Sequence, residues 1–280
     1  MDFLHKIGTK MTVNNRDETL FTLYQHDFIM KKVAVLKGIV DNHSSVLDII
    51  QGNSGVDFTD EEALISGLKA EIHFSKYHAL ETMFAIAFAL LKQPNDVWLW
   101  LSTYSFSTFN KMIADVAKSG ISSVSGKNDF ETVQSIFYKN CPTDFLEQER
   151  TKKAIHKISA IMILCAKELT YKNEYNSYKH GLRIINGSLR LKAVYDYKSE
   201  GKIISEVPGF VYLDTRDKEN AILVTKPYSY EKSYNMVRLC WHLTSLMIEQ
   251  RKIESNRNVE SGIETIDFSK IILGNYFENI

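Results

Sequence analysis

A dense group of polar side chains lies in Lys172–Ser188, the stretch KNEYNSYKHGLRIINGS. On a helix, Asn176, Lys179 and Arg183 would share one face because they are spaced by three and four residues, and His180 would lie at its edge. Lysine and arginine attract phosphate, asparagine can orient it, and histidine transfers protons near neutral pH. The pattern therefore predicts either an anion site with a catalytic histidine or a solvated basic face.

Tyrosines form a second stripe on the same predicted helix. Tyr171, Tyr175, Tyr178 and Leu182 are spaced by four, three and four residues. An aromatic stripe at helical spacing is typical of core packing. We expect these side chains to hold the polar stripe in place, with Tyr175 close to any site.

Three ionisable residues precede or interrupt an apolar run in EIHFSKYHALETMFAIAFALL. Glu71 and His78 are seven residues apart and share a helical face, and Glu81 is embedded in the apolar run. A carboxylate in such a place needs a partner, or its pKa rises. The sequence predicts either a structural ion pair of Glu81 with Lys179 or His180, or a pocket that these acidic and histidine side chains line.

Other catalytic and metal-binding patterns are missing from the sequence. Di-iron bundles use a Glu-x-x-His motif on two helices, whereas His78 and Glu81 have the reverse order and no second copy exists. Zinc motifs, glycine-rich phosphate loops and nucleophile elbows are also absent. We expect neither a metal ion nor a cofactor.

Composition limits the function classes. The 280 residues are 44% hydrophobic and 24% charged, and the formal net charge is +0. A neutral protein has no global field for nucleic acid or anionic membranes, so RNA binding would need a local basic patch. Arg150–Lys157, RTKKAIHK, carries four positive residues and predicts either such a patch or an ordinary exposed helical turn.

The sequence predicts a cytoplasmic protein without a membrane span. Its three cysteines, Cys141, Cys165 and Cys240, are odd in number and far apart, which argues against a disulfide framework and favours a reducing compartment. The longest apolar run, Ala79–Leu91, is shorter than the about 20 residues that cross a bilayer. The first residues lack the apolar segment of a signal peptide.

Long stretches without proline and with apolar residues at spacings of three and four predict helices. We expect helices over residues 16–50, 59–91, 95–120 and 129–138, a long one from 143 to about 186, and one over 229–252. Phe21, Tyr24, Phe28 and Val35 would lie on the apolar side of the first helix.

Between the last two helices, alternating segments such as LKAVYDYK and AILVTKP predict three or four antiparallel strands separated by turns at SEG, PG and DKEN. The predicted fold is mainly α, a bundle of five to six helices with a small antiparallel β-meander inserted before the last long helix. We expect a single domain, with the bundle in 1–188, the meander in 189–228, the last helix in 229–254, and a tail with a short docking helix in 255–280.

Two short motifs give a resemblance to a known group of proteins. Arg150 and His156 in RTKKAIH match the spacing of an arginine followed after four to six residues by a histidine, which is the signature of HEPN (higher-eukaryote and prokaryote nucleotide-binding) proteins. The segment Asn176–Gly181, NSYKHG, resembles an Asn-x-x-Lys-His-Gly element of bacterial and defence-associated helical proteins, with lysine where the signature has arginine. The resemblance covers only the helical part up to about residue 186.

The resemblance implies a metal-independent ribonuclease of a bacterial abortive-infection or toxin system, acting as a homodimer. His180 or His156 would be the base or acid, and Lys179, Arg183 or Arg150 would stabilise the phosphorane. Asn176 would orient the phosphate. The alternative is a non-enzymatic helical sensing or protein-binding module whose basic stripe docks RNA or a partner protein of a defence system. A small-molecule site between helices is a third hypothesis.

Overall fold

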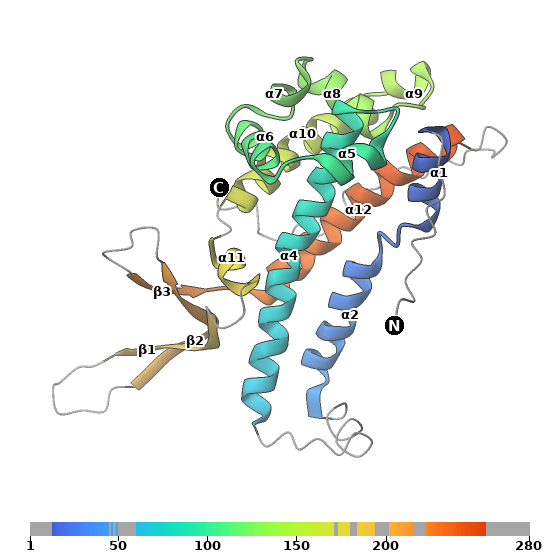
Figure 1. Ribbon diagram of the computed structural model, residues 1–280. Coiled ribbons are helices and arrows are strands. Elements are labelled where there is room, and N and C mark those ends of the chain that lie inside the picture. Colours follow the sequence, from blue (N-terminus) through green and yellow to red (C-terminus); the bar gives the residue numbers. More distant parts are fainter. Residues whose placement is uncertain are drawn as a thin grey trace, which may run out of the picture. The chain divides into compact units, whose positions relative to one another are not determined.

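The computed structural model describes residues 13–44, 46, 49, 60–170, 173–179, 184–193, 202–214 and 222–255. Most of these residues are helical, and a three-stranded antiparallel sheet precedes the last described helix (Figure 1). The predicted fold class is therefore confirmed. No helix in the described ranges combines the length and the apolar character needed to cross a bilayer. The predicted docking helix of the tail lies beyond residue 255, outside these ranges.

The described residues divide into two compact units. The first unit takes its residues from Met1–His26, Thr82–Lys167 and Leu243–Thr265, and the second from Asp27–Glu81 and Glu168–His242. One border, between His26 and Asp27, falls in a turn, and three others fall inside helices. These helices are α4 (Glu61–Lys92), α10 (Glu149–Thr170) and α12 (Tyr230–Ser255).

Short helices make up most of the first unit. They are α1 (Val13–Leu23), α5 (Val97–Thr103), α6 (Phe106–Ser119), α7 (Ser122–Ser125), α8 (Asp129–Phe137) and α9 (Thr143–Glu147). The carboxylate of Asp17 on α1 accepts hydrogen bonds from the backbone N–H groups of Val97 and Trp98, both at 2.9 Å. Asp17 thereby caps the free N-terminal amides of α5 and joins two helices about 80 residues apart.

The helix predicted over residues 95–120 is broken in two. Tyr104 is extended, with ψ of 144°, and Ser105 caps the new helix α6 by accepting a hydrogen bond from the Thr108 N–H at 3.1 Å. Serine competes for backbone N–H groups and is favoured at helix starts, so it ends one helix and begins another here.

The helix predicted over residues 16–50 is also broken, because α1 ends at Leu23 and α2 (Phe28–Asp41) follows after a turn. The interruption changes which side of the second helix is buried. Val33 is buried, whereas Phe28 and Val35, on the predicted apolar side, are 61% and 63% exposed. The prediction that these side chains are buried is therefore wrong for Phe28 and Val35.

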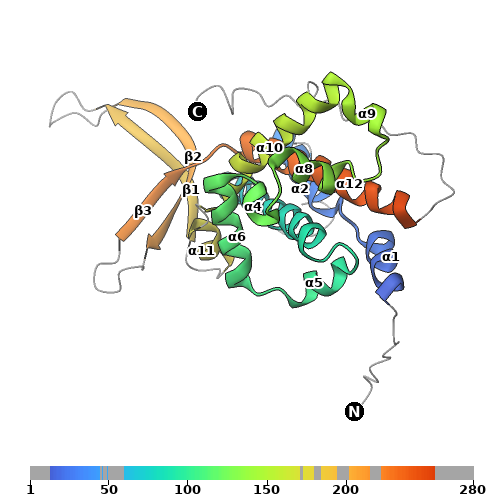
Figure 2. The ribbon, with the colours of Figure 1, turned by 90° about the horizontal axis from the view of Figure 1, so that it is seen from above.

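The second unit contains α2, the first part of α4, the start of α12, and the elements between α10 and α12. These are α11 (Asn173–Lys179), β1 (Ile184–Ala193), β2 (Lys202–Asp214) and β3 (Ile222–Pro227), with strand order β1-β2-β3. Helix α11 lies beside the sheet in both views of the ribbon (Figures 1 and 2). Phe210 of β2 is 1% exposed and contacts the rings of His73 and Phe74 on α4, so α4 covers one face of the sheet.

The long helix predicted from 143 to 186 is wrong at its end. Helix α10 stops at Thr170, α11 is a separate helix, and β1 already begins at Ile184. Asn186 and Gly187, at the predicted end of that helix, lie inside β1, where Gly187 pairs with Gly209. Pro208–Gly209, expected to be a turn, lies inside β2. Cross-strand pairing outweighs the local turn preference of these residues.

Most side chains of the apolar run of helix α4 are buried. In the first unit, Met83, Phe84, Ala87 and Phe88 on this helix are all fully buried. Cys141, Cys165 and Cys240 are buried thiols that form no disulfide bond with one another.

Candidate functional site on helices α4 and α11

Helix α11 places two of its predicted site residues against α4. The ammonium of Lys179 lies 3.1 Å from Oε2 of Glu81 and 4.1 Å from the centre of the Tyr175 ring. The Tyr178 hydroxyl donates a hydrogen bond to Glu71, and its ring stacks on Phe74 with the centroids 4.1 Å apart. The structural ion pair predicted between Glu81 and Lys179 is therefore confirmed.

Tyr175 is buried between α11 and α4 and stacks on Tyr77, with ring centroids 5.2 Å apart. Burial raises the pKa of Tyr175 far above its usual value, and the charges of Glu81 and Glu71 add to the effect. Its hydroxyl is therefore protonated at every physiological pH. The predicted packing role is therefore confirmed for Tyr175, and Tyr171 and Leu182 lie outside the described residues.

The polar stripe is only partly described. Asn176 is exposed, and His180 and Arg183 lie outside the described residues. His78 on α4 is also exposed, and its pKa is lowered, first by partial burial and then by Lys32 and Lys179, against the opposing charge of Glu81. A neutral imidazole that can accept a proton therefore lies near the Lys179–Glu81 pair.

Four lysines and four glutamates around α4 are matched one to one, and we call them the four-pair network. Each pair joins two elements of the second unit. The pairs are Lys32–Glu71 (α2 to α4), Lys76–Glu168 (α4 to α10), Lys179–Glu81 (α11 to α4) and Lys226–Glu174 (β3 to α11). The formal charge of this network is zero, so it fastens α11 and the sheet without creating a basic surface.

Two members of the network are deeply buried. The side chains of Lys76 and Glu174 are 5% and 2% exposed. Burial lowers the pKa of Lys76, and Glu168 opposes that shift. Glu174 accepts hydrogen bonds from the Tyr77 hydroxyl and from Lys226, the latter at 2.7 Å. Sequence reasoning missed both residues, although a lysine inside the run IHFSKYHAL was a signal, because a charge in an apolar helix needs a partner.

His73 is a second buried group that the sequence reasoning did not identify. Its Nδ1 lies 2.9 Å from the Ser233 hydroxyl, whose own proton is donated to the carbonyl of Ser229. Nδ1 must therefore carry the hydrogen, which leaves Nε2 as a bare lone pair. Nε2 is buried and has no partner in the described part of the chain. The surrounding rings are those of Phe74, Tyr77, Phe210 and Tyr228.

Arg150 and His156 lie in the first unit, on α10, and both are exposed. At 100° per residue, Arg150, Lys153, His156 and Lys157 fall within about 120° of the helix circumference. Lys153 and Lys157 are exposed and make no ion pair with any described residue. We call these four residues the α10 basic face.

The surroundings of His156 include an acid and an aromatic ring from α8. The His156 and Phe130 ring centroids are 6.1 Å apart. Burial opposes ionisation of Asp129, but hydrogen bonds from Ser122 and Ser159 and the charge of His156 together hold its pKa below the usual value. Asp129 is therefore an anion that attracts a protonated His156.

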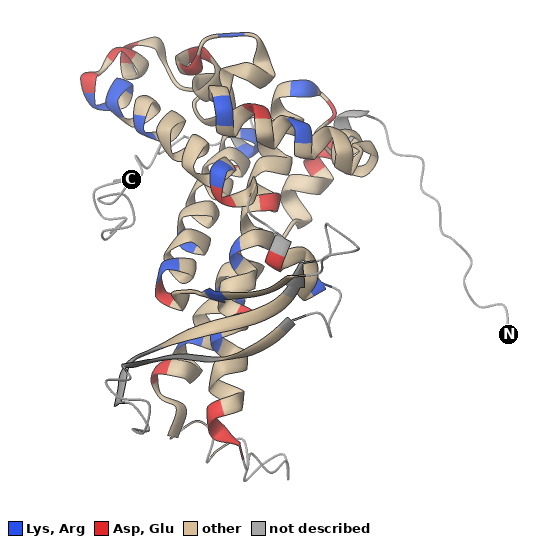
Figure 3. Ribbon diagram, turned by 90° about the vertical axis from the view of Figure 1, so that its left-hand side faces the viewer, with Lys and Arg blue, Asp and Glu red and all other residues tan. Residues whose placement is uncertain are grey.

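Charges of both signs are interspersed along the described helices (Figure 3). Within the described ranges, no three His, Cys, Asp or Glu side chains are placed to hold a metal ion. Comparison of the chain with protein-family models, with curated proteins and with solved structures gives no match.

Proposed function

We propose that this chain is an RNA-binding effector that cleaves RNA without a metal ion, using the α10 basic face. The observation that carries the proposal is the contrast between two sets of lysines. Lys179 and the other lysines of the four-pair network are neutralised by glutamates, whereas Lys153 and Lys157 are exposed and unpaired among the described residues, beside His156. Unpaired cations are the groups that bind phosphates.

The proposed reaction uses the RNA's own 2′-hydroxyl. His156 acts as the general base and removes the 2′-hydroxyl proton while the 2′-oxygen bonds to the adjacent phosphorus. Arg150 donates hydrogen bonds to the phosphorane oxygens, where negative charge builds up. The bond from phosphorus to the 5′-oxygen then breaks, and that oxygen takes a proton from a second acid or from water. The products are a 2′,3′-cyclic phosphate and a 5′-hydroxyl.

A homodimer is part of the proposal, because a second copy would bring another Arg150 and His156 to supply that acid. The resemblance to HEPN proteins supports such an arrangement and a bacterial defence setting. A cytoplasmic location belongs with it, since the substrate is cellular RNA and all three cysteines are thiols rather than disulfide-bonded to one another.

The test is cleavage of total RNA by purified protein in the presence of a chelator. Replacing His156 by alanine should lower the cleavage rate by about 10² to 10⁴, the usual contribution of a general acid or base. Arg150→Ala should lower the rate while leaving the thermal unfolding temperature unchanged, because Arg150 is exposed. His26→Ala, in the same unit, is the matched control. The proposal fails if wild-type protein leaves RNA intact or if His26→Ala loses as much activity as His156→Ala.

A second candidate is the non-enzymatic module that docks a partner protein, and the charge balance of the four-pair network favours it. In that case the network only holds α11 and the sheet in place, and no chemistry occurs there. RNA or partner binding that is equal in wild type and His156→Ala, without turnover in either, would select this candidate.

A further inference from the structure

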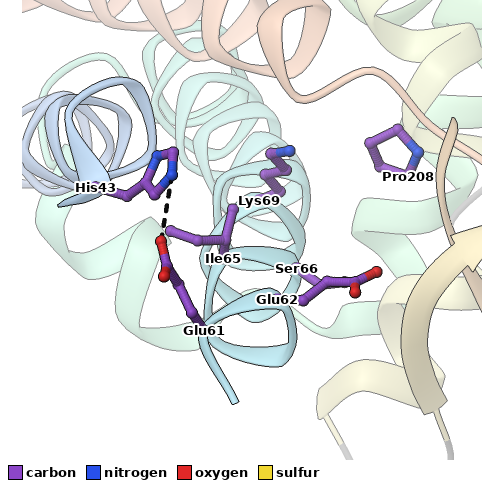
Figure 4. Close-up of a pocket in the computed structure, with 7 residues that line it drawn as sticks. All are labelled: His43, Glu61, Glu62, Ile65, Ser66, Lys69 and Pro208. Carbon is purple, nitrogen blue, oxygen red and sulfur yellow. Dashed lines mark ion pairs between the residues drawn. The ribbon is translucent and has the colours of Figure 1, made fainter. Parts of the chain in front are cut away.

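A cavity of about 410 Å³ lies in the second unit, at the start of α4 (Figure 4). Its walls come from three separate parts of the chain. They include His43 after α2, Glu61, Ile65, Ser66 and Lys69 of α4, and Pro208 of β2. In Figure 4, His43 and Pro208 lie on opposite sides and Lys69 lies between them. The volume falls within the range of about 300 to 1,000 Å³ that is usual for small-molecule sites.

On one side of the cavity, His43 and Glu61 pair with each other. Nε2 of His43 lies 3.2 Å from Oε1 of Glu61, and Nδ1 lies 3.3 Å from the carbonyl oxygen of Val40. Both ring nitrogens therefore face oxygen acceptors. The carboxylate of Glu61 keeps further acceptor positions, because a carboxylate accepts more than one hydrogen bond.

The adjacent wall carries unmatched donors. Lys69 has no carboxylate within ion-pair distance among the described residues, and its ammonium lies 5.4 Å from the centre of the Tyr230 ring. The Ser66 hydroxyl oxygen is buried and has no hydrogen-bond partner in the described part of the chain. Lys69 and Ser66 are three residues apart and so lie on one face of α4. Lys69 therefore makes this wall suited to a ligand anion.

The walls are held in place independently of any ligand. The N–H of Tyr228 donates to the carbonyl of Pro208 at 3.0 Å, and the Tyr228 hydroxyl lies 3.5 Å from the carbonyl of Ser66. Tyr228 thus joins β2 to α4 beside the cavity. Ile65 and Pro208 supply apolar surface to the walls of the cavity.

We infer that this cavity binds a small zwitterion, a free amino acid with an apolar side chain. Its carboxylate binds Lys69, its ammonium binds the Glu61 side, and its side chain packs on Ile65 and Pro208. A phosphorylated ligand is disfavoured because two carboxylates, Glu61 and Glu62, line the same cavity against one unpaired lysine. This site is separate from the α10 basic face, and the inference does not depend on RNA cleavage.

The test is isothermal titration calorimetry of the full chain with L-leucine, L-valine and L-methionine. At least one should bind the wild type, and Lys69→Gln should weaken that binding at least tenfold, whereas Lys69→Arg should keep it. Lys232→Gln, an equal charge change at an exposed position of α12, is the matched control and should bind as the wild type does. Thermal unfolding of each variant checks that the fold is intact.

Two analogues of L-leucine test the roles of its ammonium and its carboxylate separately. N-acetyl-L-leucine lacks the ammonium and isopentylamine lacks the carboxylate, so both should bind at least tenfold more weakly than L-leucine. The inference is overturned if none of the three amino acids binds at millimolar concentration, if Lys69→Gln binds as well as Lys232→Gln, or if either analogue matches L-leucine.

Discussion

At the residue scale, His73 combines deep burial with an unusual hydrogen-bonding state. Its side chain lies among four aromatic rings, and Ser233 fixes the tautomer. Burial lowers the pKa of His73 well below 6.5, and the charges of Lys76 and Lys226 lower it further. The folded protein therefore holds His73 neutral at a pH where an exposed histidine is already protonated.

This difference predicts a loss of stability in mild acid. The unfolded chain binds a proton at His73 below about pH 6.5 and the folded chain does not, so the free energy of unfolding should fall as pH drops below that value. The slope from this residue is at most about 1.4 kcal/mol per pH unit. Urea unfolding from pH 8 to 5 measures it, with His73→Phe as the variant without the titrating group.

His78 and His242 also have lowered pKa values in the folded state, and they contribute equally to the pH dependence of both proteins. The difference in pH slope between wild type and His73→Phe therefore isolates the contribution of His73. Equal pH slopes in the two proteins would show that His73 is already accessible to protons in the folded state.

At the element scale, the ion pairs of the four-pair network differ widely in how deeply their side chains are buried. The Lys76–Glu168 pair between α4 and α10 has side chains that are 5% and 27% exposed, whereas the Lys179–Glu81 pair between α11 and α4 is 41% and 19% exposed. A buried charge that loses its partner is much more costly than an exposed one, because water cannot replace the missing carboxylate.

The two pairs should therefore respond differently to loss of the glutamate. Glu168→Gln should lower the free energy of unfolding by about 2 to 3 kcal/mol, because it leaves Lys76 buried without a counter-charge. Glu81→Gln should lower it by about 1 kcal/mol or less. Urea unfolding at pH 7 measures both. Replacing Lys76 by methionine in the Glu168→Gln background should restore part of the loss; no recovery would mean that Lys76 is not charged in the fold.

The sequence predicted some elements and contacts well because the signals for them are local. Helices α4 and α12 follow from apolar spacing, and the Lys179–Glu81 pair follows from a carboxylate in an apolar run and a nearby lysine stripe. The split at Tyr104–Ser105 was missed because one serine cap decides it. The pair Lys226–Glu174 spans 52 residues and depends on the strand register, which no short pattern specifies.

At the scale of the whole molecule, the net charge of +0 means that RNA affinity must come from local cations. If Arg150, Lys153 and Lys157 each neutralise one phosphate, the logarithm of the binding constant should fall with the logarithm of salt concentration with a slope of about −2. Lys153→Gln should make that slope less negative by about 0.7. Fluorescence anisotropy with single-stranded RNA over a series of salt concentrations measures it.

Lys179→Gln is the matched control for that measurement, because Glu81 already neutralises Lys179 in the folded protein. Its slope should equal that of the wild type. A change for Lys179→Gln without one for Lys153→Gln would move the RNA site from α10 to α11.

The three buried thiols give each unit its own chemical reporter. Cys141 and Cys165 belong to the first unit and Cys240 to the second, and none is more than 9% exposed. A thiol-specific reagent can therefore react only when the unit around a cysteine opens. The relative labelling rates of single-cysteine variants would show whether the two units open together or one at a time. The measurement needs no label attached to the folded protein beforehand.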